Sequence, residues 1–148
     1  MADDVLNVLR ALGCSIEPCG SRVTCDPAPA DTDQDYLVEM QPADDIIAKV
    51  VSELVEAGFV WEGNEHYQQA SRSGFMSWRL DDVNLIVTAD RAFAGKHRVA
   101  TALCKRLNLL NKPDRIAAFQ AVLYSNEWNG TTTGPVDPAA VQIEEIAF

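Results

Sequence analysis

The chain has 148 residues, of which 47% are hydrophobic and 23% charged, and its formal net charge is −10. This length and composition predict one globular domain with its own core and exclude an intrinsically disordered chain. No apolar run approaches the roughly 18 residues of a membrane span, and the acidic N-terminus lacks the pattern of a signal peptide, so we expect a cytoplasmic protein without a membrane partner.

The negative charge is concentrated in the first part of the chain. Residues 1–65 hold 14 acidic and 3 basic residues, whereas residues 66–148 hold 8 acidic and 9 basic residues. The overall acidity argues against broad binding to duplex DNA. Seven of the 12 lysine and arginine residues fall between Arg91 and Arg115. This basic segment either contacts a phosphate group or forms a solvated helix face.

The first part of the chain predicts a helix, two strands and a second helix. Apolar residues at helical spacing predict a helix over 3–12, and a weak strand follows over 14–19. We expect a proline-containing loop over 22–32. Polar and apolar residues then alternate over 34–40, which is typical of a strand. A wide apolar face predicts a strong helix from about 42 to 57.

The second part predicts three strands, two helices and a tail. A short strand over 59–61 precedes a polar loop over 62–74. The segment 75–89 predicts two strands around a turn made by two adjacent aspartates, or one bent strand. A helix follows to about residue 107, and another covers 111–125.

The helix before residue 107 has a recognisable start and an expected buried face. Asp90 is a suitable N-cap, because its side chain can accept a hydrogen bond from the first turn. We expect this helix to bury Phe93, Ala100, Leu103 and Leu107.

The order of these elements predicts an α/β or α+β domain. Helices would pack on a mixed β-sheet, with one helix before the first strand and two after the last. We expect the domain to occupy residues 1–125. Residues 126–148, which are rich in glycine, proline and threonine, would form an extended arm or tail.

The segment CGSRVTCDPAPADTDQDYLV, residues 19–38, carries the candidate chemistry. Residues two apart on a strand point to the same face, so Asp33 and Asp35 would present two carboxylates side by side. Like charges this close raise each other's pKa, so the pair is unfavourable without a cation between them. Oxygen ligands suit Mg²⁺ or Mn²⁺, which also bring phosphate substrates.

A glycine–serine turn upstream offers the matching phosphate site. Gly20 lets the backbone approach an anion closely, and the Ser21 hydroxyl and nearby N–H groups can hold phosphate oxygens. Arg22 either contacts a phosphate or pairs with one of the nearby acids. The turn and the aspartates together form a coherent site for a nucleoside triphosphate.

These residues resemble the signature of the DNA polymerase β-like nucleotidyltransferase superfamily: a Gly-Ser turn, a spacer, and Asp-x-Asp ahead of an apolar strand. The resemblance covers roughly residues 3 to 90. It implies a minimal nucleotidyltransferase-like core with helices packed on a mixed β-sheet. It also implies that Gly20 and Ser21 contact the β- and γ-phosphates and that Asp33 and Asp35 bind the metal ions, Mg²⁺ or Mn²⁺.

The resemblance further implies a third carboxylate on a later strand, and here the chain departs from the pattern. The equivalent stretch is VNLIV, 83–87, and the residue in the catalytic position is Asn84. An asparagine offers a neutral carbonyl oxygen but cannot act as a base. Asp81 or Asp82 would fill the role only if the strand bends there, and adjacent aspartates favour a hairpin turn. Otherwise the enzyme works with a weakened second metal, or it has lost catalysis.

We therefore expect a nucleotidyltransferase-like protein, similar to compact bacterial and phage proteins of this kind. It would transfer a nucleoside monophosphate from a nucleoside triphosphate to an unknown acceptor, such as a protein or an RNA, with a divalent metal. The alternative is a catalytically degenerate binding protein on the same fold, for example a phage-type inhibitor that acts through an acidic surface. A third reading is an unrelated α+β interaction domain in which the Asp-x-Asp motif is only a turn.

Overall fold

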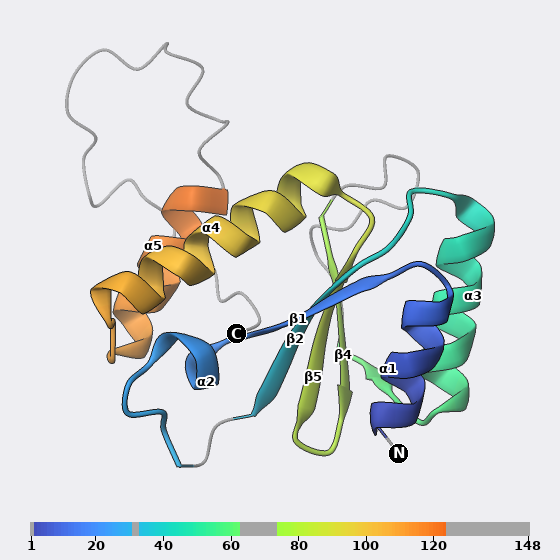
Figure 1. Ribbon diagram of the computed structural model, residues 1–148, viewed down its shortest axis with the longest axis horizontal. Coiled ribbons are helices and arrows are strands. Elements are labelled where there is room, and N and C mark those ends of the chain that lie inside the picture. Colours follow the sequence, from blue (N-terminus) through green and yellow to red (C-terminus); the bar gives the residue numbers. More distant parts are fainter. Residues whose placement is uncertain (1, 31–32, 63–73, 124–148) are drawn as a thin grey trace, which may run out of the picture.

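The computed structural model describes residues 2–30, 33–62 and 74–123. A five-stranded mixed β-sheet stands between two groups of helices (Figure 1). This architecture confirms the predicted α+β class. The predicted tail, 126–148, and most of the predicted polar loop, 62–74, lie outside the described residues, so the domain boundary after residue 125 stays a prediction.

Two parallel strands form the centre of the sheet. The strands are β1 (Ser15–Cys19), β2 (Gln34–Glu39), β3 (Val60–Trp61), β4 (Met76–Leu80) and β5 (Val83–Thr88). Their order is β1-β2-β5-β4-β3, in which the β2–β5 pair is parallel and the other three pairs are antiparallel. The central position of β5 explains why all six of its residues are buried.

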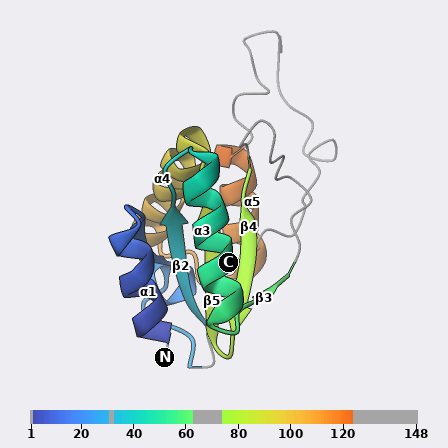
Figure 2. The same ribbon diagram turned by 90° about the vertical axis from the view of Figure 1, so that its right-hand side faces the viewer.

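Helices cover both faces of the sheet. They are α1 (Ala2–Ala11), α2 (Ser21–Thr24), α3 (Asp44–Glu56), α4 (Arg91–Leu107) and α5 (Lys112–Leu123). The pair α1 and α3 lies on one face, and α4 and α5 lie on the other (Figure 2). No helix among the described residues is both long enough and apolar enough to cross a membrane.

The helix α2 corrects the prediction of a continuous loop over 22–32. A four-residue helix contains barely one turn, so the chain shows no apolar repeat from which it could be predicted. The turn is nevertheless well packed, because Ser21 and Thr24 are buried. It follows β1 directly and brings the Gly-Ser turn against the sheet.

Each face of the central strands contributes to a separate hydrophobic core. Leu37 and Ile86 belong to the core under α4 and α5, whereas their neighbours Val38 and Leu85 belong to the core under α1 and α3. Adjacent residues of a strand point to opposite faces, so both central strands supply both cores. Polar residues on these strands are therefore buried unless they lie at a strand end.

The start of α4 confirms the prediction for Asp90, and its buried face is partly different from the prediction. The Phe93 N–H donates to Asp90 Oδ1 at 3.1 Å, as expected of an N-cap. Ala100 is fully buried as predicted, but the prediction for Leu103 and Leu107 is wrong, since they are 37% and 58% exposed. The buried face of the helix consists of Ala94, His97, Ala100 and Cys104.

Candidate functional site

Four side chains lie in one row across the sheet, on the face that packs against α4 and α5. The strand register pairs Cys19 with Asp35, Asp35 with Asn84, and Asn84 with Arg79. Paired residues on neighbouring strands point to the same face. The sheet therefore brings the predicted aspartate and the predicted asparagine side by side, although they are 49 positions apart in the chain.

Asp35 is the buried centre of this row. It is 3% exposed, and Asn84 Nδ2 donates to its Oδ1 at 3.2 Å. Burial raises the pKa of Asp35 to about 6; the hydrogen bond from Asn84 lowers it, and the charge of Asp33 raises it further. The carboxylate is thus compensated only in part, and a cation would favour its ionised form.

The Gly-Ser turn lies directly against Asp35. Gly20 has a φ of +75°, and a Cβ atom at this position would overlap the carboxylate of Asp35. Only glycine fits here without strain, because both the backbone conformation and the space exclude a side chain. Ser21 is buried at the start of α2, while Arg22 is exposed and its charge favours the ionised form of Asp35.

Asp33 is paired with an arginine from β4. Arg79 Nη1 lies 3.0 Å from Asp33 Oδ2, and Arg79 Nε donates to Glu62 Oε1 at 2.6 Å. The side chains of Arg79 and Asp33 are 34% and 42% exposed. A partly solvated pair of this kind contributes about 1 kcal/mol or less to stability.

Both ends of the Asn84 amide are engaged. Ser77 Oγ donates to Asn84 Oδ1 at 3.1 Å, while the amide nitrogen donates to Asp35. The nearby aspartates do not replace Asn84. Asp81, with a φ of +52°, and Asp82 form the exposed turn between β4 and β5, as the hairpin prediction expected. The site therefore contains two carboxylates and one amide.

This set of donors fits one divalent cation. Mg²⁺ usually takes one or two protein carboxylates and completes its shell with water and substrate phosphates. Asp33 and Asp35 would supply the carboxylates, whereas the end of the Asn84 amide that faces Asp35 is its nitrogen, which is not a cation ligand. Within residues 2–30, 33–62 and 74–123, no group of three or more His, Cys, Asp or Glu side chains could hold a metal ion. The described residues thus do not supply the three carboxylates expected for a pair of cations.

The sequence prediction missed Arg79 and Ser77. Both stand on β4 in alternation with the apolar residues Met76, Trp78 and Leu80, which belong to the opposite core. This alternation was visible in the sequence and would have indicated a polar row on one face of the strand. The contacts of Arg79 with Asp33 and of Ser77 with Asn84 depend on the strand order, which the sequence does not show.

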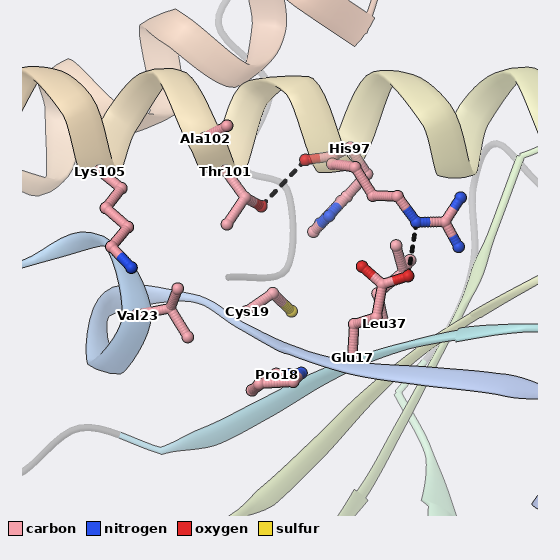
Figure 3. Close-up of a pocket in the computed structure, with 10 residues that line it drawn as sticks. Glu17, Pro18, Cys19, Val23, Leu37, His97, Thr101, Ala102 and Lys105 are labelled. Carbon is pink, nitrogen blue, oxygen red and sulfur yellow. Dashed lines mark hydrogen bonds and ion pairs between the residues drawn. The ribbon is translucent and has the colours of Figure 1, made fainter.

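A pocket of about 220 Å³ lies between β1 and α4 (Figure 3). Its walls include Pro18, Leu37 and Ala102, and His97 points toward it from α4. His97 is 2% exposed, and its Nδ1 has no hydrogen-bond partner in the described part of the chain. Burial, with a smaller contribution from Arg98, lowers the pKa of His97 to about 4. The imidazole is therefore neutral at physiological pH.

Part of the basic segment attaches α4 to the rest of the molecule. Arg98 Nε donates to Glu17 Oε1 and its Nη2 to Glu39 Oε1, both at 2.7 Å. Lys96 Nζ donates to the Leu123 carbonyl at 3.3 Å. Arg98 and Lys96 thus join α4 to β1, β2 and α5.

Comparison with known proteins finds similarity in structure only. No protein-family model matches the chain, and no curated protein matches its sequence. Among solved structures, the chain is similar to a cytoplasmic RNA terminal U-transferase at 18% identity and a TM-score of 0.44, covering 86% of this chain and 36% of that protein. It is similar to the RNA terminal uridylyl transferase Cid1 at 18% identity and a TM-score of 0.48, covering 86% of this chain and 37% of that protein.

A third similar structure is terminal uridylyl transferase 4 from Trypanosoma brucei with bound UTP and UpU. The identity is 13% and the TM-score 0.44, and the match covers 97% of this chain and 56% of that protein. The chain thus spans between about a third and just over half of the length of these enzymes. At this level of identity and TM-score, the similarity says nothing about activity or substrate.

Proposed function

We propose that this chain is a nucleotidyltransferase-like protein that binds a nucleoside triphosphate and one divalent cation, Mg²⁺ or Mn²⁺. The turn Gly20–Arg22 would hold the phosphates, and Asp33 and Asp35 would hold the cation. The observation that carries the proposal is the contact between Gly20 and the buried Asp35, which joins the two halves of the sequence motif. The resemblance of that motif to the polymerase β-like superfamily supports the same assignment.

The residues of the site support transfer of a nucleoside monophosphate with release of pyrophosphate. The Gly20 backbone and the side chains of Ser21 and Arg22 would orient the phosphate oxygens. A bound divalent cation would neutralise the triphosphate and favour attack on the α-phosphorus. The oxygen of an acceptor hydroxyl, on a protein or an RNA, would form the new bond as the bond to pyrophosphate breaks.

Asp35 is the residue that would accept the proton of the attacking hydroxyl. Asn84 cannot do so, because an amide is not a base at neutral pH. Burial raises the pKa of Asp35 to about 6 in the cation-free site, and a bound cation would lower it, so Asp35 would be a weak base once the cation is bound. Because Asp35 would also hold the cation, we expect the transfer to be slower than at a site with three carboxylates.

The test is isothermal titration of the protein with each nucleoside triphosphate in the presence of Mn²⁺. We expect the wild type to bind and Asp33→Ala and Asp35→Ala to give no measurable heat, because each removes one of two carboxylate ligands. Asp114→Ala, an acid in the first turn of α5, is the matched control and should bind like the wild type. Absence of heat with the wild type would contradict the proposal.

A second candidate is a binding protein on the same fold that has lost catalysis. The observation in its favour is that both carboxylates already have partners within the chain, Asp33 with Arg79 and Asp35 with Asn84. Such a protein would act through acidic surfaces, such as the first turns of α1 and α3. If only the variant Asn84→Asp binds Mn²⁺ and nucleotide, and the wild type does not, this candidate replaces the first.

A further inference from the structure

We propose that Arg79 is an internal counter-ion of the site, which holds Asp33 while no divalent cation is bound and transfers to a phosphate group of the nucleotide when the cation binds. The inference rests on the proposed function, because the cation and the nucleotide are its ligands. It adds a role for a residue that is absent from the sequence motif.

The geometry brings the Arg79 guanidinium to the position where the cation is expected. Its Nη1 lies 3.0 Å from Asp33 Oδ2. Arg79 is also the register partner of Asn84, which in turn contacts Asp35, and its charge favours the ionised form of Asp35. The guanidinium therefore compensates the same pair of carboxylates as the cation would, and the two would compete for Asp33 Oδ2.

The contact with Asp33 is weak enough to be displaced. The Arg79 and Asp33 side chains are 34% and 42% exposed, and ion pairs of this exposure change an equilibrium by about fivefold at most. A divalent cation carries twice the charge of the guanidinium, and Asp33 and Asp35 would both hold it. Cation binding would therefore release Arg79 from Asp33 at the cost of at most this factor of about five in cation affinity.

The second contact keeps the released guanidinium at the site. Arg79 Nε donates to Glu62 Oε1 at 2.6 Å, and this bond does not involve Asp33. The planar guanidinium can keep Nε on Glu62 while Nη1 turns toward a phosphate oxygen, a favoured partner of arginine. Arg79 thus opposes binding of the cation alone and assists binding of the cation with a nucleotide.

The test compares Arg79→Gln with Arg22→Gln. Each variant loses one positive charge that acts on Asp35, and Arg79 in addition forms the ion pair with Asp33 Oδ2 at 3.0 Å. Electron paramagnetic resonance of free Mn²⁺ measures cation affinity without nucleotide, and titration with ATP at saturating Mn²⁺ measures nucleotide affinity. We expect Arg79→Gln to bind Mn²⁺ alone about fivefold more tightly than the wild type, with a smaller gain for Arg22→Gln. We expect its affinity for ATP with Mn²⁺ to fall about tenfold.

Two outcomes would overturn the inference, and they are distinguishable. If the wild type binds Mn²⁺ and Arg79→Gln binds it no more tightly than the wild type or than Arg22→Gln, Arg79 has only a structural role and the proposed function stands. If neither the wild type nor Arg79→Gln binds Mn²⁺, the proposed function fails and the inference fails with it. Arg79→Met, which keeps the aliphatic stem, replaces Arg79→Gln if the latter does not fold, and the same changes are expected.

Discussion

Asp35 occupies a position where a carboxylate is poorly stabilised. It is 3% exposed, and its side chain accepts a hydrogen bond from the neutral amide of Asn84. Asp33, two residues earlier, adds a like charge. A purely structural role would be better served by an amide or an apolar residue, because these need no counter-charge when buried. The burial of Asp35 is therefore the residue-level feature that most favours a function.

We predict that Asp35→Asn stabilises the cation-free protein at pH 8. Burial raises the pKa of Asp35 from 3.8 to about 6, so the folded state binds the proton more tightly than the unfolded state and loses stability as the pH rises through 6. We expect a gain of about 3 kcal/mol in the free energy of unfolding at pH 8 and almost none at pH 4.

Urea denaturation of the wild type and the variant at both pH values measures this difference. Asp114→Asn is the control: its carboxylate is exposed in the first turn of α5, so its removal should not stabilise the protein. A variant Asp35→Asn that is less stable than the wild type at pH 8 would show that Asp35 is better compensated than the burial implies.

Residue types in the site were predictable, whereas their contacts were not. The motif identified Gly20, Asp33, Asp35 and Asn84 from spacing and from the apolar strand that follows. The contact between Asp35 and Asn84 depends on β2 and β5 becoming parallel neighbours, with β4 on the other side of β5. Strand order is set by packing between distant segments, so no local pattern reports it. For the same reason Arg79 could not be assigned to Asp33.

At the scale of elements, the turn from β1 into α2 depends on a single residue. Gly20 combines a φ of +75° with close packing against Asp35. We predict that Gly20→Ala destabilises the protein by about 3 kcal/mol or more, because the added Cβ is strained in this conformation and also displaces the carboxylate. Binding of Mn²⁺ should be lost together with stability.

Gly95→Ala is the matched control for this prediction. Gly95 lies inside α4, and a Cβ atom added there meets nothing within 4 Å. Replacing a helix-interior glycine by alanine stabilises by about 0.5–1 kcal/mol, so this variant should unfold at a higher temperature than the wild type. If thermal unfolding shows the two variants shifting in the same direction, the turn does not require glycine for the reasons given.

The helices were predictable to different degrees for a physical reason. The predicted starts and ends of α1 and α4 agree with the structure within two residues, because long amphipathic segments carry many repeats of the pattern and α4 has an N-cap. The buried stripe of α4 was predicted less well. Leucines were expected to be inside, but small residues allow α4 to approach the sheet closely, and Leu103 and Leu107 remain at the surface.

At the scale of the whole molecule, one histidine couples stability to pH. His97 lies between the rings of Phe93 and Phe119, whose centroids are 5.9 and 5.0 Å from its own. Burial is the main reason why its pKa falls from 6.5 to about 4. The unfolded state binds the proton more tightly, so stability is fully present above pH 6.5 and is lost as the pH falls toward 4.

We predict that His97→Phe reduces the loss of stability between pH 6.5 and pH 4. Phenylalanine keeps an aromatic ring in the cluster and removes the titrating group, which accounts for about 3 kcal/mol over this range. Denaturation midpoints across this pH range provide the measurement. His66→Gln removes the second histidine of the sequence and serves as the control. Equal pH dependence of the wild type and His97→Phe would contradict the assignment.

The parallel pairing of Asp35 with Asn84 has a consequence for how the chain selects its own fold. If β5 slipped by one residue against β2, Val83 or Leu85 would stand beside Asp35, and Asn84 would point into the core under α1 and α3. Each such misaligned state would bury a carboxylate and an amide without partners, at several kcal/mol. The two polar residues therefore discriminate against competing strand alignments, so the amide that leaves the site short of a carboxylate also makes the native register unique.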